Sequence, residues 1–209
     1  MRTYLYKLTS DRGGAPCASP PADGETPLLT LAICKPAIRR TAQPGDRILG
    51  ITSHALAHAE GYPLCAVIYA AVVEQGIDAR DYFQPAGLFT HRPDCIYEFH
   101  QQNGAAAHNG RSNLHRSEAN LLKDLGRYPL YRNGRVLLSH NFRYFGSEAF
   151  PIPAHLHLIY TAAETLGQGH RVFTPKDPES READALFRQL WRKLTRHTPA
   201  QVDRDAYDH

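Results

Sequence analysis

The sequence predicts an α+β fold, in which helices pack on a mixed β-sheet. Three observations predict it. Short apolar segments bounded by Gly, Pro, Asn and Asp recur along the 209-residue chain, and this pattern is typical of strands. Helix-capping residues introduce several of the segments between them. The C-terminal part carries apolar residues at helical spacing.

The first 73 residues predict four strands and a short helix. The strand segments are Met1–Thr9, Leu28–Cys34, Arg47–Thr52 and Leu64–Val73. Between them, Ser10–Thr26 is dense in Gly and Pro, which indicates a mobile loop. Pro36 fits the first turn of a helix over Lys35–Ala42. Gln43–Asp46 indicates a turn, and Ser53–Gly61 a short helix or loop.

The middle of the chain predicts shorter elements. Ala79–Phe83 and Cys95–Phe99 are expected to be extended or connecting pieces. Gln101–Asn113 is rich in Gly and Asn and contains little that is apolar, so we expect a long loop. Ser117–Leu125 predicts a helix, with Ser117 as its N-cap.

The remaining residues predict a hairpin and two helices. Asn133-Gly134 lies between Tyr128–Tyr131 and Val136–Ser139, a strong hairpin signal. A helix is expected at about 154–166, and a last helix begins at Asp177-Pro178. The apolar face of this last helix consists of Ala183, Leu186, Phe187, Leu190, Trp191 and Leu194. We expect one α+β domain over residues 1–175, with the helix and charged tail of residues 176–209 packed on it.

The composition excludes several classes of protein. Apolar residues make up 42% and charged residues 22% of the chain, the balance of a soluble globular protein. The longest apolar run, Leu64–Val73, is too short to span a membrane, and no secretory signal is visible. The four cysteines contain no CxxC pair, so we expect a reducing, cytoplasmic setting and no disulfide framework. The oligomeric state is not predicted.

A cluster of basic residues follows the second strand. A strand delivers Lys35 to the start of a short helix that carries Arg39 and Arg40, and Arg47 begins the next strand. Such residues can bind the phosphates of a nucleotide or nucleic acid. The alternative is a solvated helix face. A second basic stretch, residues 92–143, holds eight Lys or Arg against four acids, interleaved with aromatic rings, as in proteins that grip unstacked bases.

Candidate catalytic residues are weaker. Lys35, Asp94, Glu98 and His140 offer acid–base groups, since carboxylates and imidazole exchange protons near neutrality. Cys34 and Cys95 lie in apolar runs, where an inert buried thiol is the simpler interpretation. His54 and His58 share a helix face, but no third ligand has metal-site spacing. We therefore expect no metal and no cofactor.

The run LAICKPAIRRTAQPGDRILG (Leu31–Gly50) resembles the opening motif of the nucleotide modification associated domain 2 family. Further similar pieces follow in order: TYLYKLT at the N-terminus, Ala66–Gln75, Tyr82-Phe83 and Val136–Gly146. The resemblance covers most of residues 1–175. It implies an α+β fold and a place in systems that modify bases in nucleic acid, often in phages and bacteria, and it leaves the reaction open.

The same region is more loosely similar to base-reading domains of the PUA and EVE type. That likeness implies a small β-barrel-like core with a pocket for a modified base. Gly45-Asp46 would mark the turn into a barrel strand, and Tyr69, Tyr82 and Phe83 would stack on the base.

Three functions therefore remain open. The first is a protein that binds or processes nucleotides or nucleic acid, with DNA favoured, in DNA base modification of phage or anti-phage systems. The second is an enzyme acting on a modified base or nucleotide. The third is a protein-interaction module in which the helix near residues 180–196 docks on a partner.

Overall fold

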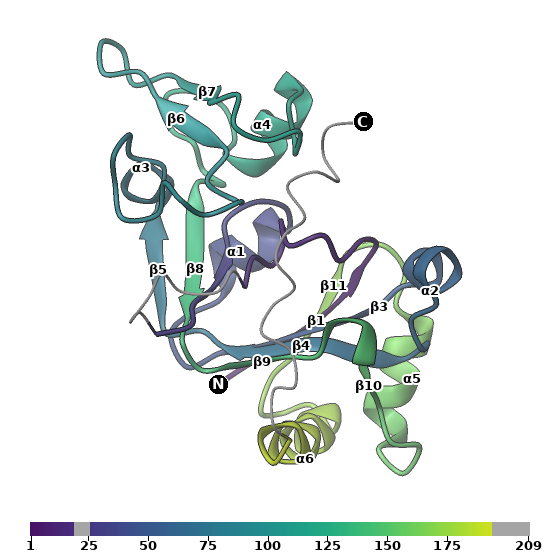
Figure 1. The fold of residues 1–209 in the computed structure, drawn as a ribbon. Coiled ribbons are helices and arrows are strands. Elements are labelled where there is room, and N and C mark those ends of the chain that lie inside the picture. The colour runs from purple at the N-terminus through teal and green to yellow at the C-terminus, as the bar shows by residue number, and fades with distance from the viewer. Residues whose placement is uncertain (19–25, 194–209) are drawn as a thin grey trace. The chain divides into compact units, whose positions relative to one another are not determined.

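The computed structural model describes residues 1–18 and 26–193. These residues form helices and mixed sheets (Figure 1), which confirms the α+β prediction. Their contacts divide them into two compact units. Unit 1 contains residues 1–11, 43–73 and 141–193, and unit 2 contains residues 12–18, 26–42 and 74–140. Part of the predicted 10–26 loop and the whole tail beyond residue 193 lie outside the described residues.

Unit 1 contains a six-stranded mixed sheet. Its strands are β1 (Thr3–Leu8), β3 (Arg47–Thr52), β4 (Ala66–Val72), β9 (Phe142–Tyr144), β10 (Phe150–Pro151) and β11 (His170–Phe173). The order is β10-β4-β3-β1-β11, with β9 also paired to β4. β1 and β3 are parallel, and the other pairs are antiparallel. Because the order begins and ends at unpaired edges, the sheet is not the closed barrel that the PUA-type likeness implied.

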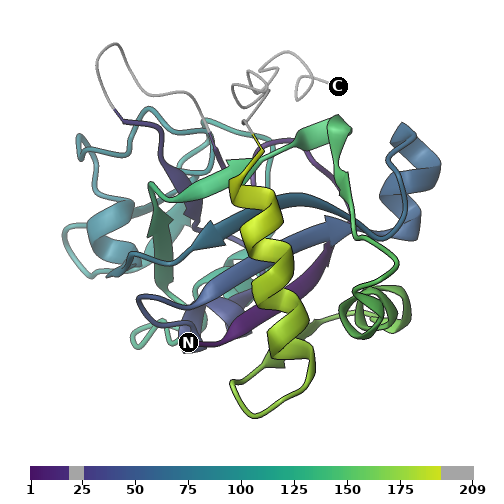
Figure 2. The same cartoon turned by 90° about the horizontal axis from the view of Figure 1, so that it is seen from below.

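Helices cover the sheet of unit 1. They are α2 (His54–Glu60), α5 (His157–Thr165), α6 (Glu179–Trp191) and the 3₁₀ turn η1 (Gly146–Glu148). Figure 2 shows α6 lying across one face of the sheet. Its apolar residues Ala183, Leu186, Phe187 and Leu190 are buried in one cluster with strand residues such as Leu5 and Leu49. The predicted amphipathic helix is therefore confirmed. The interaction-module hypothesis required this face to be exposed to a partner, whereas it is buried in unit 1. Leu194 lies outside the described residues.

A glycine in β3 is fixed by close packing. Tyr69, on β4, pairs with Gly50, and its ring covers the glycine. A Cβ atom at residue 50 would lie only 2.1 Å from Tyr69 Cε1. A side chain at this position would therefore force the Tyr69 ring to move.

Unit 2 contains two small antiparallel sheets. The first has the order β2-β8-β5 and the second pairs β6 with β7. The strands are β2 (Leu29–Leu31), β5 (Gln75–Asp78), β6 (Tyr97–Phe99), β7 (Ala106–His108) and β8 (Arg135–Ser139). The helices are α1 (Pro36–Thr41), α3 (Ala79–Tyr82) and α4 (Glu118–Asp124). α4 has the predicted N-cap, since Ser117 Oγ accepts from the Asn120 amide at 3.2 Å.

Three predictions for unit 2 were wrong. Asn133-Gly134 does not join two strands: β8 pairs with β2 and β5, and Tyr128–Tyr131 is not a strand. The Asn133 amide instead donates to Leu125 O, so this turn closes on the end of α4. Ala79–Phe83, expected to be an extended or connecting piece, contains helix α3, which is capped by Asp78. The long loop 101–113 contains β7.

No helix in the described part of the chain has the length and apolar character needed to cross a membrane.

Candidate active site

The chain makes a strained turn between β2 and α1. Cys34 and Lys35 both adopt left-handed backbone conformations, with φ of 56° and 43°, and α1 begins at the next residue, Pro36. Each left-handed non-glycine residue costs about 1 kcal/mol. Such strain persists only where surrounding contacts enforce it, and it is common at functional sites. A strained strand–turn–helix junction also carries the nucleophile in α/β-hydrolases.

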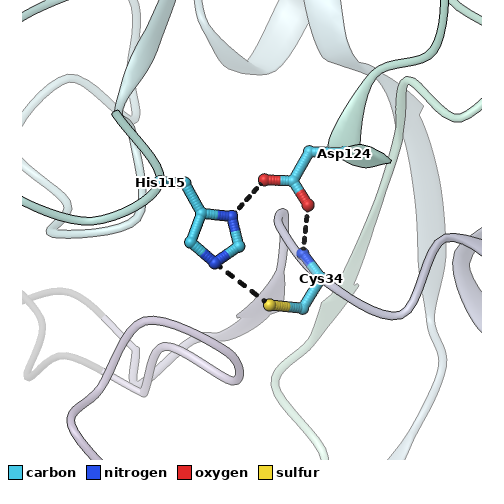
Figure 3. A group of neighbouring side chains, drawn as sticks. All are labelled: Cys34, His115 and Asp124. Carbon is cyan, nitrogen blue, oxygen red and sulfur yellow. Dashed lines mark hydrogen bonds and ion pairs between the residues drawn. The ribbon is translucent and has the colours of Figure 1, made fainter. Parts of the chain in front are cut away.

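The side chains of Cys34, His115 and Asp124 form a hydrogen-bonded group in unit 2 (Figure 3). Cys34 Sγ lies 3.4 Å from His115 Nε2. His115 Nδ1 lies 2.5 Å from Asp124 Oδ2. A thiol, an imidazole and a carboxylate in this sequence of contacts have the arrangement of a catalytic triad, in which the carboxylate orients the base that serves the nucleophile.

Asp124 is fully buried at the end of α4, and both of its oxygens accept hydrogen bonds. Oδ1 accepts from the Cys34 amide at 2.7 Å. Oδ2 accepts from His115 and from Tyr97 Oη, which lies at 2.8 Å. Burial and the neighbouring Asp124 raise the pKa of Tyr97, so this phenol keeps its proton and donates. The carboxylate therefore keeps a proton on His115 Nδ1 and also accepts the hydrogen bond of the Cys34 amide.

His115 is positively charged at neutral pH. Its hydrogen bonds to Asp124 and then to Cys34 raise its pKa to about 10, while partial burial opposes the rise. Its side chain is 20% exposed, so solvent reaches one side of the ring. The charged form carries a proton on Nε2, which faces Sγ. The protonated ring can therefore donate from Nε2 to Cys34 Sγ.

Arg39, predicted to hold phosphate, is fully buried instead. Its Nε donates to Cys34 O at 2.7 Å, and Nη2 donates to Asp124 O at 2.6 Å. Nη1 donates to the carbonyls of Asn133 and Arg135, both at 2.7 Å. A guanidinium enclosed by protein carbonyls is not accessible to a phosphate group.

The other predicted phosphate residues lie in different surroundings. Lys35 is half-buried beside Cys34, and its pKa is lowered by burial and by Lys123, while the charge of Cys34 opposes this. Arg40 is exposed and donates to Asn133 Oδ1 at 3.0 Å. Arg47 belongs to unit 1, where it pairs with Asp184 and covers the ring of Phe187.

The predicted base-stacking residues are core residues. Tyr69, Tyr82 and Phe83 are at most 1% exposed. Tyr69 Oη lies 2.8 Å from Tyr6 Oη, and Phe83 packs edge-on against Tyr97. Their rings fill the interiors of their units, so they have no face open to a base in this structure.

The predicted acid–base residues lie outside the triad. Asp94 is fully buried and accepts from Thr30 Oγ1 at 2.5 Å and from Tyr82 Oη at 2.6 Å. Its other partner is Arg92, at 3.7 Å. Glu98 is half-buried on β6. The exposed His140 contacts Glu74 through its amide and Pro27 O through its ring.

The triad was not predicted from the sequence. Cys34 was interpreted as an inert thiol, whereas it is half-buried and bonded to His115. Its partners lie 81 and 90 positions further along the chain, and no spacing rule connects such distances. The available local signal was a cysteine followed by Lys-Pro directly after a buried strand.

The same donor atoms resemble a metal site, since all three lie within 4.8 Å of one another. A metal bound to both His115 Nδ1 and Asp124 Oδ2 would need about 2.0–2.2 Å to each atom. These two atoms are only 2.5 Å apart, as a direct hydrogen bond requires. Cys34 Sγ and His115 Nε2 alone would be two ligands short of a structural zinc site. The arrangement fits a triad better.

The segment that contains α4 is rich in exposed cations. Within residues 111–135, all of which are described, Glu118 is the single exposed acid. The exposed basic residues of the same range are Arg111, Arg116, Lys123, Arg127 and Arg132. Asn133 connects two cationic residues, because it accepts from Arg40 and its Nδ2 donates to Lys123 O at 3.0 Å. Arg40 and Lys123 therefore lie close together on this surface.

The family model described as nucleotide modification associated domain 2 matches residues 1–204 of the chain. No curated protein and no solved structure matches it. The family match agrees with the resemblance found in the motifs, and the chain belongs to this family.

Proposed function

We propose that this member of the nucleotide modification associated domain 2 family is an enzyme that uses Cys34 as a nucleophile on a modified base or nucleotide. The observation that carries the proposal is the contact series from Cys34 Sγ through His115 to the buried Asp124. The family name supports the substrate class.

The triad supplies the groups needed for nucleophilic substitution at an electrophilic carbon of the base or of its modifying group. The Cys34 thiolate forms a bond to that carbon, and the leaving group departs with the proton of His115 Nε2. Neutral His115 then takes a proton from a water molecule that attacks the same carbon and releases the thiolate. Asp124 stabilises the imidazolium before and after the cycle.

The amide of Cys34 has no part in stabilising the substrate. It donates to Asp124 Oδ1, whereas many thiol and serine enzymes use this amide to bind a developing oxyanion. Negative charge must therefore be met by side chains. Lys35 is the adjoining cation, and its pKa responds to the charge of Cys34.

The basic surface around Arg40 and Lys123 is proposed to bind the phosphate backbone of nucleic acid, with DNA as the favoured form. The support is the excess of exposed cations over exposed acids within residues 111–135, since phosphate contacts supply most of the affinity for nucleic acid. The proposed setting is DNA base modification in phage or anti-phage systems, as the family resemblance implies.

The nucleophile is tested by trapping it. Duplex DNA carrying modified pyrimidines is incubated with the protein, and intact-protein mass spectrometry monitors an added mass on Cys34. The expected result is a mass increase that Cys34→Ala abolishes and Cys95→Ala retains, since Cys95 is a buried thiol of the same unit. Conversion of the DNA by Cys34→Ala at the wild-type rate would refute the proposal.

The basic surface is tested by the salt dependence of binding to labelled duplex DNA. Each phosphate contact adds about 0.9 to the magnitude of the log–log salt slope. The double variant Arg40→Glu, Lys123→Glu should lower the magnitude by about 1.8. The control is Arg181→Glu, Arg188→Glu, which makes the same charge change at exposed positions of α6. Equal loss of affinity in both variants would show a long-range charge effect and would reject a local site.

A further inference from the structure

The buried guanidinium of Arg39 connects two members of the triad through their main chains. It donates to the carbonyl of Cys34 and to the carbonyl of Asp124. It also donates to Asn133 O, just before β8, and to Arg135 O, at the start of β8. Four carbonyls from three separate segments therefore converge on one planar group.

Both carbonyls of the triad need such a partner. Asp124 is the last residue of α4, and carbonyls in the last turn of a helix have no partner within the helix. Cys34 is one of two consecutive left-handed residues, a conformation that surrounding contacts must enforce. The Arg39 amide adds a third contact, to Lys35 O at 3.1 Å. Arg39 thus holds both peptide groups of the strained turn and the end of α4.

We propose that Arg39 is a positioning residue, which fixes the main chains of Cys34 and Asp124 at the separation that His115 bridges. The inference rests on the proposed nucleophilic role of Cys34. Arginine suits the task because its rigid planar fork has five N–H donors, whereas a lysine offers a single ammonium point. Arg39 does not touch the substrate. It acts through the distance from Sγ to the imidazole.

Arg39→Lys tests the proposal, with Arg92→Lys as its matched control. Arg92 is also buried in unit 2 and donates to Cys17 O, Leu28 O and Thr30 Oγ1. Both variants lose bonds between a buried guanidinium and carbonyls, so both should lower the melting temperature. The rate of Cys34 alkylation by iodoacetamide is followed by peptide mass spectrometry from pH 5 to 9.5.

Arg39→Lys should slow alkylation at pH 6 at least tenfold and move the pH profile toward that of an ordinary thiol. Arg92→Lys should keep the wild-type profile. An unchanged profile in Arg39→Lys, or equal shifts in both variants, would overturn the proposal. If the Arg39→Lys variant does not fold, the Arg39→Gln variant is used for the same test. If neither folds while Arg92→Lys does, Arg39 serves the fold itself and the positioning role is rejected.

The same data separate this inference from the proposed function. A wild-type Cys34 that reacts like free cysteine, with no effect of His115→Ala, removes the nucleophile and the positioning role together. A reactive, His115-dependent Cys34 whose profile survives Arg39→Lys removes the positioning role alone.

Discussion

Asp124→Asn separates the chemistry of the triad from the stability of unit 2. The carboxylate accepts three hydrogen bonds, from the Cys34 amide, His115 Nδ1 and Tyr97 Oη. An asparagine can keep its oxygen toward the Cys34 amide, but its NH₂ group then faces His115. His115 must present an unprotonated Nδ1 to that group, so its single proton moves to Nε2. The base is left in the wrong tautomer and loses its positive charge.

The size of the effect follows from this change. Two bonds to a charged acceptor are lost or replaced, each contributing about 1.5–3 kcal/mol, and the lower burial penalty of the amide offsets part of this. We expect a loss of about 3 kcal/mol of unfolding free energy. An ordinary thiol is only about 0.3% ionised at pH 6, so Cys34 should be alkylated about 100-fold more slowly than a thiolate paired with His115.

The matched control is Asp94→Asn. Asp94 is equally buried in the same unit and accepts from Thr30 and Tyr82. The Asp94→Asn variant should lose a similar amount of unfolding free energy in urea titrations. Its Cys34 should keep the wild-type alkylation rate at pH 6. The reasoning is refuted if Cys34 is alkylated at the same rate in both variants. A carboxylate that acts through His115 cannot be replaced without lowering the reactivity of Cys34.

The remaining predictions concern stability. The pKa of His115 is raised to about 10 from an unfolded value near 6.5, so its bonds stabilise the fold fully below pH 6.5 and lose this effect as pH rises through 10. The difference in unfolding free energy between wild type and His115→Asn should thus shrink from pH 6 to pH 10 in urea titrations, and a constant difference would contradict the linkage. Gly50→Ala should cost about 3 kcal/mol or more in thermal unfolding, because its Cβ meets the Tyr69 ring; Gly167→Ala, with open space around it, should change little. Tyr69→Phe should cost about 1 kcal/mol by removing the buried hydrogen bond between Tyr69 Oη and Tyr6 Oη, and should leave DNA affinity unchanged because Tyr69 is a core residue.

The elements that could be predicted from sequence carry local signals. Arg47–Thr52 is bounded by a turn and a cap, and β3 occupies the same residues. The apolar face of α6 was visible in its spacing. β5, β9, β10 and β11 were not predicted, because strands of two to four residues show too few alternations. The hairpin predicted at Asn133-Gly134 was wrong because turn residues do not determine which segments the turn brings together.

The site could not be predicted for a related reason. Arg39 and Arg40 are adjacent basic residues with the same local signal, yet one is fully buried and the other exposed. Successive helix residues point about 100° apart, and only the packing of α1 determines which of them faces inward. The aromatic residues assigned to base stacking show the same ambiguity, since a ring in an apolar strand suits a core as well as a pocket.

Burial of Asp124 explains how one side chain can organise the whole triad. Its two oxygens bond the amide of Cys34 and the ring of His115, so a single rigid group sets both the main-chain and side-chain positions of the other two residues. The electrostatic partners of Cys34 include three cations, His115, Lys35 and Arg39. Since the Cys34 amide donates to Asp124 and Arg39 is enclosed by carbonyls, His115 and Lys35 are the cations left for a developing anion. In the proposed reaction, such surroundings suit a substrate that gains or carries negative charge beside the reacting carbon, as a nucleotide or its base does during substitution.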